Sequence, residues 1–295
     1  MKLGKINRQS IGISGFTSVL KNYEGMPKEV YVAGTLPKTP VHSVAIVGSR
    51  RPTAYGKEVT HRLAYDLAKR GVVIVSGLAY GVDAIAHQAA LEAGGTTVAV
   101  LANGLHRVYP AGHTALAETI IQRGGALISE QPPGVDAHPY HFLSRNRLVS
   151  GVVDAVIVTE ATERSGTVST VTHALSQNKD VFAVPGPITS LLSAGPNRFL
   201  AQGAHVCTSA QDVLDIIAPE IRPEQTLMPL GDTPLEQAIL TLIQQGTRDT
   251  SAMADLLTDH SASDITQALT MLELNGVITI DAGNASLTST YGGGS

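Results

Sequence analysis

Three short polar segments of this sequence have the composition of a phosphate-binding site, and each follows an apolar run. Their members are glycines, hydroxyl side chains and arginines: Gly48, Ser49, Arg50 and Arg51 in the first, Ser76, Gly77 and Gly81 in the second, and Ser165, Gly166 and Thr167 in the third. Glycine lets backbone N–H groups approach a ligand, and the start of a following helix favours an anion. The planar guanidinium of arginine matches phosphate oxygens. We therefore predict that these segments contact ligand phosphates. The alternatives are a structural ion pair for the arginine at position 50 and, for the second and third segments, only the capping or start of the helix that follows.

A fourth segment combines an aromatic ring with two arginines. Phe142 precedes Arg145, Asn146 and Arg147. Aromatic rings stack on nucleobases and guanidinium groups pair with phosphates, so this composition is typical of single-stranded nucleic-acid binding. The alternative is that these arginines form salt bridges at the edge of a sheet. Tyr109, in a predicted turn, is a weaker candidate for stacking on a base.

Other polar residues have structural interpretations. Asp83 and His87 are four residues apart in a predicted helix, where side chains are neighbours, so we expect a structural hydrogen bond between them. Glu160 ends an apolar run and is expected to orient an arginine, with no sign that it is a catalytic acid.

The elements that position these residues follow an alternating pattern. Apolar runs typical of buried strands occur at 44–47, 72–75, 97–101, 126–129, 155–159 and 181–184, with helical patterns between most of them. This alternation predicts an α/β fold with a mostly parallel, doubly wound sheet and helices on both faces. In such a sheet the carboxyl ends of the strands share one edge, where we expect the polar segments to meet.

Charge is distributed unevenly along the chain. The net charge is −4, yet residues 230–295 contain one base and eight acids, and the remainder carries a net charge of +3. Helical patterns near 234–243, 250–257 and 263–274, followed by a strand at 276–280 that enters a hairpin, predict a small winged-helix-like domain. Its third helix has no lysine or arginine. We therefore favour a protein-contact or regulatory role for this domain over DNA binding.

The pattern predicts five segments: a short extension at 1–40, the main α/β domain at 41–218, a proline-bearing linker at 219–230, the winged-helix-like domain at 231–288 and a tail at 289–295. The sequence has no apolar run long enough to span a membrane, no signal-peptide pattern and a single cysteine, Cys207. These features predict a cytoplasmic protein. We find no dinucleotide fingerprint, no Walker A loop and no paired metal-ligand spacing, so we expect neither a cofactor nor a metal.

Six motifs give the chain a specific resemblance. From about Tyr31 to Ile217 it resembles the DNA-processing protein A (DprA/Smf) family. The motifs occur in the family order: 48–50, 76–87, 129–134, 145–147, 160–167 and 184–186. The resemblance implies an extended Rossmann-like fold, single-stranded DNA binding, a homodimer, and a non-enzymatic role as a recombination mediator. That role is the protection of incoming DNA and the loading of RecA recombinase during natural transformation and homologous recombination.

The sequence also departs from the family pattern. Leu143 occupies a usual proline position, and His106 and His113 occupy positions where an acid and an asparagine are expected. A second hypothesis is a nucleotide-binding or nucleotide-processing protein similar to the phosphoribohydrolases. Those enzymes have a glutamate three residues after a Gly-Thr pair, whereas Thr170 occupies that position here. For the dimer, Leu191 and Leu192 in a predicted loop are a modest physical hint, because exposed apolar side chains in loops often mark a contact. The alternative, which we favour from the sequence, is that the two leucines belong to a local core.

Overall fold

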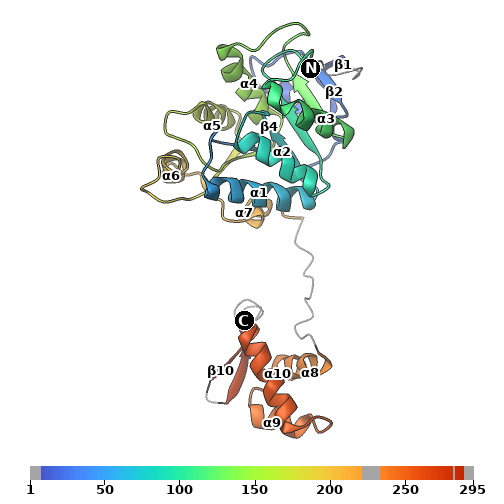
Figure 1. Ribbon diagram of the computed structural model, residues 1–295, viewed down its shortest axis with the longest axis vertical. Helices are drawn as coiled ribbons and strands as arrows, with labels where there is room; N and C mark the ends of the chain where they lie inside the picture. Colours follow the sequence, from blue (N-terminus) through green and yellow to red (C-terminus); the bar gives the residue numbers. More distant parts are fainter. Residues whose placement is uncertain (1–7, 221–232, 282, 289–295) are drawn as a thin grey trace. The chain divides into compact units, whose positions relative to one another are not determined.

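The computed structural model describes residues 8–220, 233–281 and 283–288 (Figure 1). The chain divides into two compact units, Met1–Arg222 and Pro223–Ser295.

A mixed, mostly parallel sheet forms the centre of the first unit. Its described strands are β1 (Arg8–Gly12), β2 (Glu29–Gly34), β3 (Ser43–Val47), β4 (Val73–Ser76), β5 (Thr97–Val100), β6 (Ala126–Ser129), β7 (Ala155–Val158), β8 (Asp180–Ala183) and β9 (His205–Val206). They lie in the order β1-β2-β6-β5-β4-β3-β7-β8-β9. The strands from β3 to β9 are parallel to one another, whereas β2 pairs antiparallel with both β1 and β6. The predicted α/β class and parallel sheet are confirmed.

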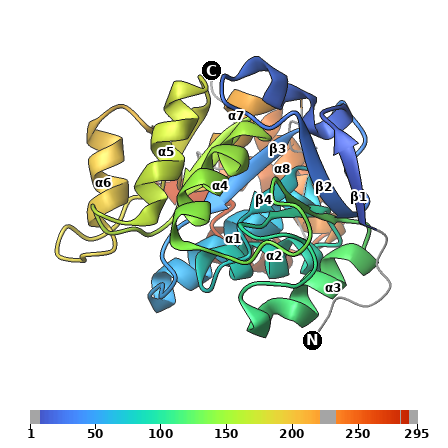
Figure 2. The ribbon, with the colours of Figure 1, turned by 90° about the horizontal axis from the view of Figure 1, so that it is seen from above.

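Helices cover both faces of this sheet (Figures 1 and 2). One face packs against α1 (Ala54–Lys69), α2 (Val82–Glu92), α3 (Thr114–Gln122) and α7 (Ala210–Ile217). The other packs against the 3-10 helix η1 (Gly15–Asn22) and against α4 (Pro139–Gly151), α5 (Gly166–Ser176) and α6 (Ala194–Ala201). Successive side chains of a strand point to opposite faces. Accordingly, Val44 and Ile46 join one core cluster while Ala45 and Val47 join the other.

The direction of winding reverses at β3. This strand pairs with β4 on one side and with β7 on the other, so Val44 lies opposite both Ile74 and Ala155. The loops after β3 and β7 therefore leave the same sheet edge and lead to helices on opposite faces. In open α/β sheets such a switch point leaves a crevice at the carboxyl ends of the strands.

The sequence predicted that residues 1–40 form a short extension separate from the main domain, and the structure differs on this point. The structure places β1 and β2 in the same sheet as the main domain, with Tyr31 opposite Ser129 of β6. Phe16 and Leu20 of η1 are buried in the core beneath α4. The predicted boundary at residue 41 therefore separated two strands from the sheet to which they belong.

The second unit has the predicted order of elements. It contains α8 (Pro234–Gln244), α9 (Thr250–Leu256), α10 (Ala262–Leu274) and a hairpin of β10 (Ile278–Asp281) and β11 (Asn284–Leu287). A separate core cluster includes Ile239, Met253 and Leu269 from the helices and Ile278 from the hairpin. A β-bridge joins Asp249 to Asn284, and the arrangement is of the winged-helix type.

None of the helices in the described ranges has the length and apolar character needed to cross a membrane.

Candidate functional site

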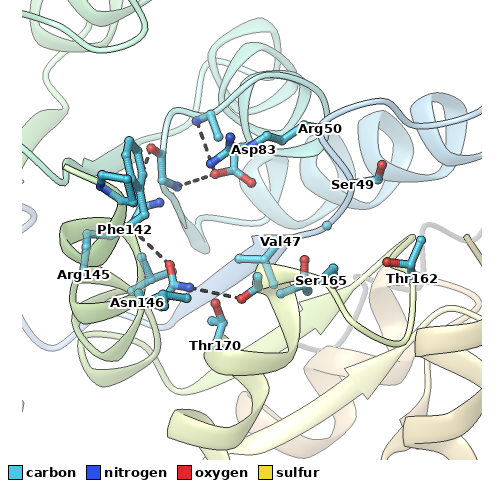
Figure 3. A pocket seen from close by; sticks show the side chains of 18 of the residues that line it. Val47, Ser49, Arg50, Asp83, Phe142, Arg145, Asn146, Thr162, Ser165 and Thr170 are labelled. Carbon is cyan, nitrogen blue, oxygen red and sulfur yellow. Dashed lines mark hydrogen bonds between the residues drawn. The ribbon is translucent and has the colours of Figure 1, made fainter. Parts of the chain in front are cut away.

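A cavity of about 580 Å³ occupies the crevice at the switch point (Figure 3). It collects most of the residues that the sequence predicted for the site: Gly48, Ser49, Arg50, Gly77, Phe142, Arg145, Asn146, Ser165, Gly166 and Thr167. The loop after β3 and helix α4 face one another across it, and the start of α5 closes a third side. Tyr109 also lines the cavity.

An arginine and two aromatic rings form a row on the wall of the cavity. The guanidinium carbon of Arg50 lies 5.5 Å from the centre of the Phe142 ring, and the Phe142 ring lies 5.5 Å from that of Tyr109. Arg50 is exposed, and Tyr109 retains 46% of its accessible surface. The Phe142 ring between them is partly buried. Accessible rings can stack on unpaired bases while an exposed guanidinium binds phosphate. We call Arg50, Phe142 and Tyr109 the stacking row.

Helix α5 begins at the cavity with Ser165 as its N-cap. The Ser165 hydroxyl is buried and has no hydrogen-bond partner within the described part of the chain. Asn146 Nδ2 donates to Gly166 O at 3.2 Å, which joins α4 to the start of α5. The first turn of a helix carries partial positive charge, so this side of the cavity favours an anion.

Arg145 also lines the cavity, but it is only 6% exposed. Its Nη1 donates to Gly77 O at 2.7 Å and to Val100 O. Gly77 is also held at its N–H group. Asp83 Oδ2 accepts hydrogen bonds from Gly77 N at 3.1 Å and from Ala79 N at 3.3 Å. A Cβ at position 77 would overlap the Arg145 guanidinium. Arg145 and Asp83 therefore hold the β4–α2 loop, which favours a bracing role for Arg145.

Burial and charge act on this pair in opposite directions. Desolvation raises the pKa of the Asp83 carboxyl, and the Arg145 charge and the hydrogen bonds to that carboxyl counteract the rise. Desolvation likewise lowers the pKa of Arg145, and Asp83 counteracts that change. Both groups are buried side chains of opposite charge, so each depends on the other for stabilisation.

The second predicted segment has mainly internal contacts. Ser76 is buried, and its hydroxyl donates to Ile46 O of β3 at 2.7 Å. Gly81 has φ of +77°, and a Cβ there would overlap Ser49 O. Neither residue lines the cavity. Their surroundings favour loop packing over the predicted anion contact.

Arg147 and Arg51 lie outside the cavity lining. The Arg147 guanidinium pairs with Glu130 at the end of β6, which matches the salt-bridge alternative raised from the sequence. Arg51 is exposed, and its backbone N–H donates to Ser49 Oγ at 3.1 Å.

Two expected contacts differ in the structure. Glu160 binds no arginine in the described residues. Its carboxylate accepts from Thr53 N at 2.8 Å and from Thr53 Oγ1 at 2.6 Å. Thr53 is the N-cap of α1, so Glu160 sets the end of the loop that carries Arg50. His87 also lacks the expected bond to Asp83, because its Nδ1 lies 2.7 Å from Thr97 Oγ1.

The His87 ring is fully buried, and desolvation, followed by the charges of His113 and Arg145, lowers its pKa to about 3. Thr97 Oγ1 donates to Ile74 O at 2.6 Å, so the neutral ring carries its proton on Nδ1 and donates to that hydroxyl. The arrangement is structural. No group of three metal-binding side chains is found among the residues that the structure describes.

The comparisons with known proteins agree with this geometry. Residues 10–218 match the family of DNA recombination-mediator protein A. The chain belongs to this family. A DprA structure from Streptococcus pneumoniae matches with a TM-score of 0.65 and 36% identity, over 72% of this chain and 75% of that one. A DprA structure from Helicobacter pylori matches with a TM-score of 0.66 and 32% identity, over 75% of this chain and 99% of that one.

Curated DprA/Smf relatives match over the same region. The putative DNA processing protein DprA of Mycobacterium tuberculosis is 49% identical over 175 residues, which are 59% of this chain and 45% of that protein. The protein Smf of Escherichia coli is 42% identical over 189 residues, 64% of this chain and 50% of that protein. The chain thus spans about half the length of the curated relatives it matches.

Some residues of this cavity were not predicted from the sequence. Pro139, Leu143, Val149, Thr162, Thr170 and Leu192 also line it. Leu143 lies in α4, two residues before the 145–147 motif, and Thr162 and Leu192 lie in the loops before α5 and α6, but nothing in the sequence shows that these side chains face the cavity. Leu192 O accepts from Ala161 N at 2.7 Å, whereas Leu191 is 81% exposed. The two leucines of the predicted contact loop therefore have different surroundings.

Proposed function

We propose that this protein binds single-stranded DNA and acts as a recombination mediator that protects the incoming strand and loads a RecA-type recombinase. The observation that carries the proposal is the stacking row of Arg50, Phe142 and Tyr109, placed beside the start of α5. The row offers aromatic rings for bases, and Arg50 and the helix terminus offer positive charge for phosphates. The related Helicobacter pylori protein is described as binding single-stranded DNA.

The same geometry favours single strands over duplexes. Stacking on Phe142 and Tyr109 requires bases that are not already stacked in a double helix. Every base has a π face, so such binding tolerates different sequences. We expect a single strand to outcompete a duplex of the same sequence in a competition titration, and equal affinity for the two would contradict the proposal.

Arg50→Ala tests the stacking row directly. Loss of the guanidinium should weaken oligonucleotide binding about tenfold, because one phosphate contact and one cation–π contact are removed. The slope of log affinity against log salt should become shallower by about 0.7, the value for one phosphate contact on a single strand. Arg51→Ala is the matched control, since Arg51 is also exposed but does not line the cavity.

Fluorescence anisotropy across a salt series measures both quantities. Equal losses for Arg50→Ala and Arg51→Ala would indicate a diffuse electrostatic effect and would remove the stacking row from the proposal. A large fall in melting temperature for Arg50→Ala with unchanged binding would make Arg50 structural.

The nucleotide-processing hypothesis has weaker support. The acidic side chain among the cavity-lining residues is Asp83, and its carboxylate is buried and bonded to two backbone N–H groups. It is therefore poorly placed to act as a general base. Release of base or phosphate from nucleoside monophosphates during incubation with the protein would reverse this preference.

The proposed homodimer uses the exposed loop between β8 and α6. Ile188 is 95% exposed and Leu191 is 81% exposed in that loop. Exposed apolar side chains close together are typical of contact surfaces. A dimer would place two cavities on one strand and raise affinity through effective concentration. Leu191→Asp should produce monomers in light scattering and weaken binding to long oligonucleotides much more than to short ones.

Recombinase loading requires its own assay. RecA-type filament assembly on strands already coated with single-strand-binding protein should be accelerated by the wild-type protein and much less by Arg50→Ala at the same protein concentration. Normal stimulation by Arg50→Ala, with DNA binding weakened, would show that mediation does not depend on the cavity.

A further inference from the structure

We propose that Tyr80, supported by His113, is a second stacking platform for a nucleobase, outside the cavity and next to Arg50. The inference rests on the proposed binding of single-stranded DNA and extends it by one subsite. Tyr80 belongs to the β4–α2 loop, and 53% of its surface is exposed, although it is not part of the cavity lining.

The Tyr80 ring packs against the His113 ring. Its centre lies 4.7 Å from that of the His113 ring, and the two planes meet at 68°, an edge-to-face contact. A Cβ at position 112 would lie 3.1 Å from Tyr80 Oη, so Gly112 lets the tyrosine hydroxyl pack closely on the backbone at that position. His113 is itself fixed, because its Nδ1 donates to Leu78 O at 2.8 Å. The ring is thus oriented before any ligand arrives.

The backbone that presents Tyr80 is strained. Leu78 has φ of +56°, a left-handed conformation that is unfavourable for a leucine. Asp83 accepts from the N–H groups of Gly77 and Ala79 on either side of it, and the Leu78 side chain is completely buried. Strain of this kind persists only where the surroundings enforce it, and it is concentrated at functional sites. Here the enforced turn buries Leu78 and leaves Tyr80 at the surface two residues later.

Tyr80 is also adjacent to the stacking row through the backbone. Gly81, the next residue, packs so closely on the first loop that a Cβ there would lie 2.6 Å from the carbonyl carbon of Arg50. Val82 N donates to Ser49 O at 3.1 Å and joins the same two loops. Arg50 therefore contacts both regions, with its guanidinium over Phe142 and its backbone against Gly81, the residue that follows Tyr80. A strand whose phosphate binds Arg50 can place one base on each side.

The absence of tryptophan from the sequence gives a direct test. Tyr80→Trp introduces a single indole, whose fluorescence should be quenched when a nucleobase stacks on it. Leu175→Trp is the control, since Leu175 is exposed near the far end of α5 from the cavity. We expect quenching of Tyr80→Trp by single-stranded oligonucleotides and none for Leu175→Trp.

Affinity measurements provide a second readout. Tyr80→Ala should weaken binding about fivefold or more, the equivalent of one stacked base, with an unchanged salt slope because no phosphate contact is lost. Tyr80→Phe should retain most of the affinity, because the ring remains. His113→Ala, which removes the support, should fall between the wild type and Tyr80→Ala, and circular dichroism should confirm that each variant is folded.

The outcomes separate this inference from the function on which it rests. Tight binding by the wild type, with unchanged affinity for Tyr80→Ala and no quenching of Tyr80→Trp, would overturn the platform and leave the cavity proposal intact. A salt slope that becomes shallower in Tyr80→Ala would also overturn it, since the contact would then involve phosphate. Failure of the wild type to bind any single strand would overturn both.

Discussion

At the scale of single residues, the contacts of Arg145 favour a structural role over the phosphate contact that its position in the sequence predicted. Its type and position suggested a ligand contact, and the structure instead bonds it to Gly77 O and Val100 O. Arg145→Ala should lower the free energy of unfolding by about 3–5 kcal/mol, because Asp83 would remain buried without its opposite charge. Arg123→Ala, at an exposed arginine, is the control. Urea denaturation checks the difference.

The contrasting result would be a stable Arg145→Ala protein that has lost DNA binding with the same severity as Arg50→Ala. That combination would return Arg145 to the role predicted from the sequence. The double variant, Arg145→Asn with Asp83→Asn, removes both charges together. Its loss of stability should be smaller than the sum of the losses in the two single variants, because the two groups are coupled.

His87 predicts a pH dependence of stability. Its pKa is about 3 in the folded protein against 6.5 for an ordinary histidine. Below pH 6.5 the unfolded chain therefore binds a proton that the folded one excludes, so His87 destabilises the fold progressively as the pH falls towards 3. The slope for one such group is about 1.4 kcal/mol per pH unit. Wild type and His87→Gln, compared by urea denaturation at pH 7.5 and 5, should differ in this slope.

A wild-type stability that falls no more steeply than that of His87→Gln would show that His87 titrates normally. His138→Gln, a substitution at an exposed histidine, serves as the control.

Residue types in this chain indicated which segments meet, but not what each residue contacts. Gly48, Arg50 and Gly166 line the cavity as predicted. Gly77 also lines the cavity, but at Gly77 and Gly81 the missing Cβ leaves space for another part of the protein, namely the Arg145 guanidinium and the backbone of the first loop. Sequence cannot distinguish these cases, because both require a residue without a Cβ.

At the scale of elements, the contact between β7 and α1 positions the Arg50 loop. Glu160 binds both polar groups of Thr53, and a Cβ on Gly56 would overlap the Glu160 carboxylate. The carboxylate is buried and doubly bonded, so it cannot move aside without losing these bonds. Gly56→Ala should therefore cost about 1–3 kcal/mol of stability and weaken DNA binding.

Gly12→Ala is the matched control, because nothing lies within 4 Å of a Cβ at position 12. Thermal melts and oligonucleotide titrations of both variants test the prediction. Equal and small effects would mean that the Glu160 contact does not set the position of the loop.

The strand pattern was predictable and the strand order was not. Runs such as 126–129 and 155–159 are continuous and apolar because both faces of the parallel sheet are covered. The order, which places β7 beside β3 and so creates the crevice, depends on contacts between residues over one hundred positions apart. β2 was missed because it pairs antiparallel with β6 and so lies outside the βα repeat on which the prediction was based.

At the scale of the whole molecule, the two units have opposite charge. Residues 230–295 carry eight acids and one base, and the rest of the chain has a net charge of +3. A protein truncated before residue 225 should keep single-strand binding, and at low salt it should bind more tightly, because an acidic unit no longer repels the phosphates. Titration at two salt concentrations measures the change.

If the isolated segment 225–295 binds single strands while the truncated protein does not, the assignment of function to the two units is reversed. Helix α10 argues against that outcome, because it contains no lysine or arginine to neutralise phosphates.

The bracing of Gly77 by Arg145 and Asp83 has a consequence for the speed of binding. A loop held at both its carbonyl and its N–H group, beside a turn already fixed at Leu78, needs no rearrangement before a strand enters. Association should then be a single step whose observed rate rises linearly with DNA concentration. Salt should mainly slow the association rate, and loss of an aromatic ring should mainly speed dissociation. In stopped-flow records, a rate that levels off at high DNA concentration would reveal a hidden opening step.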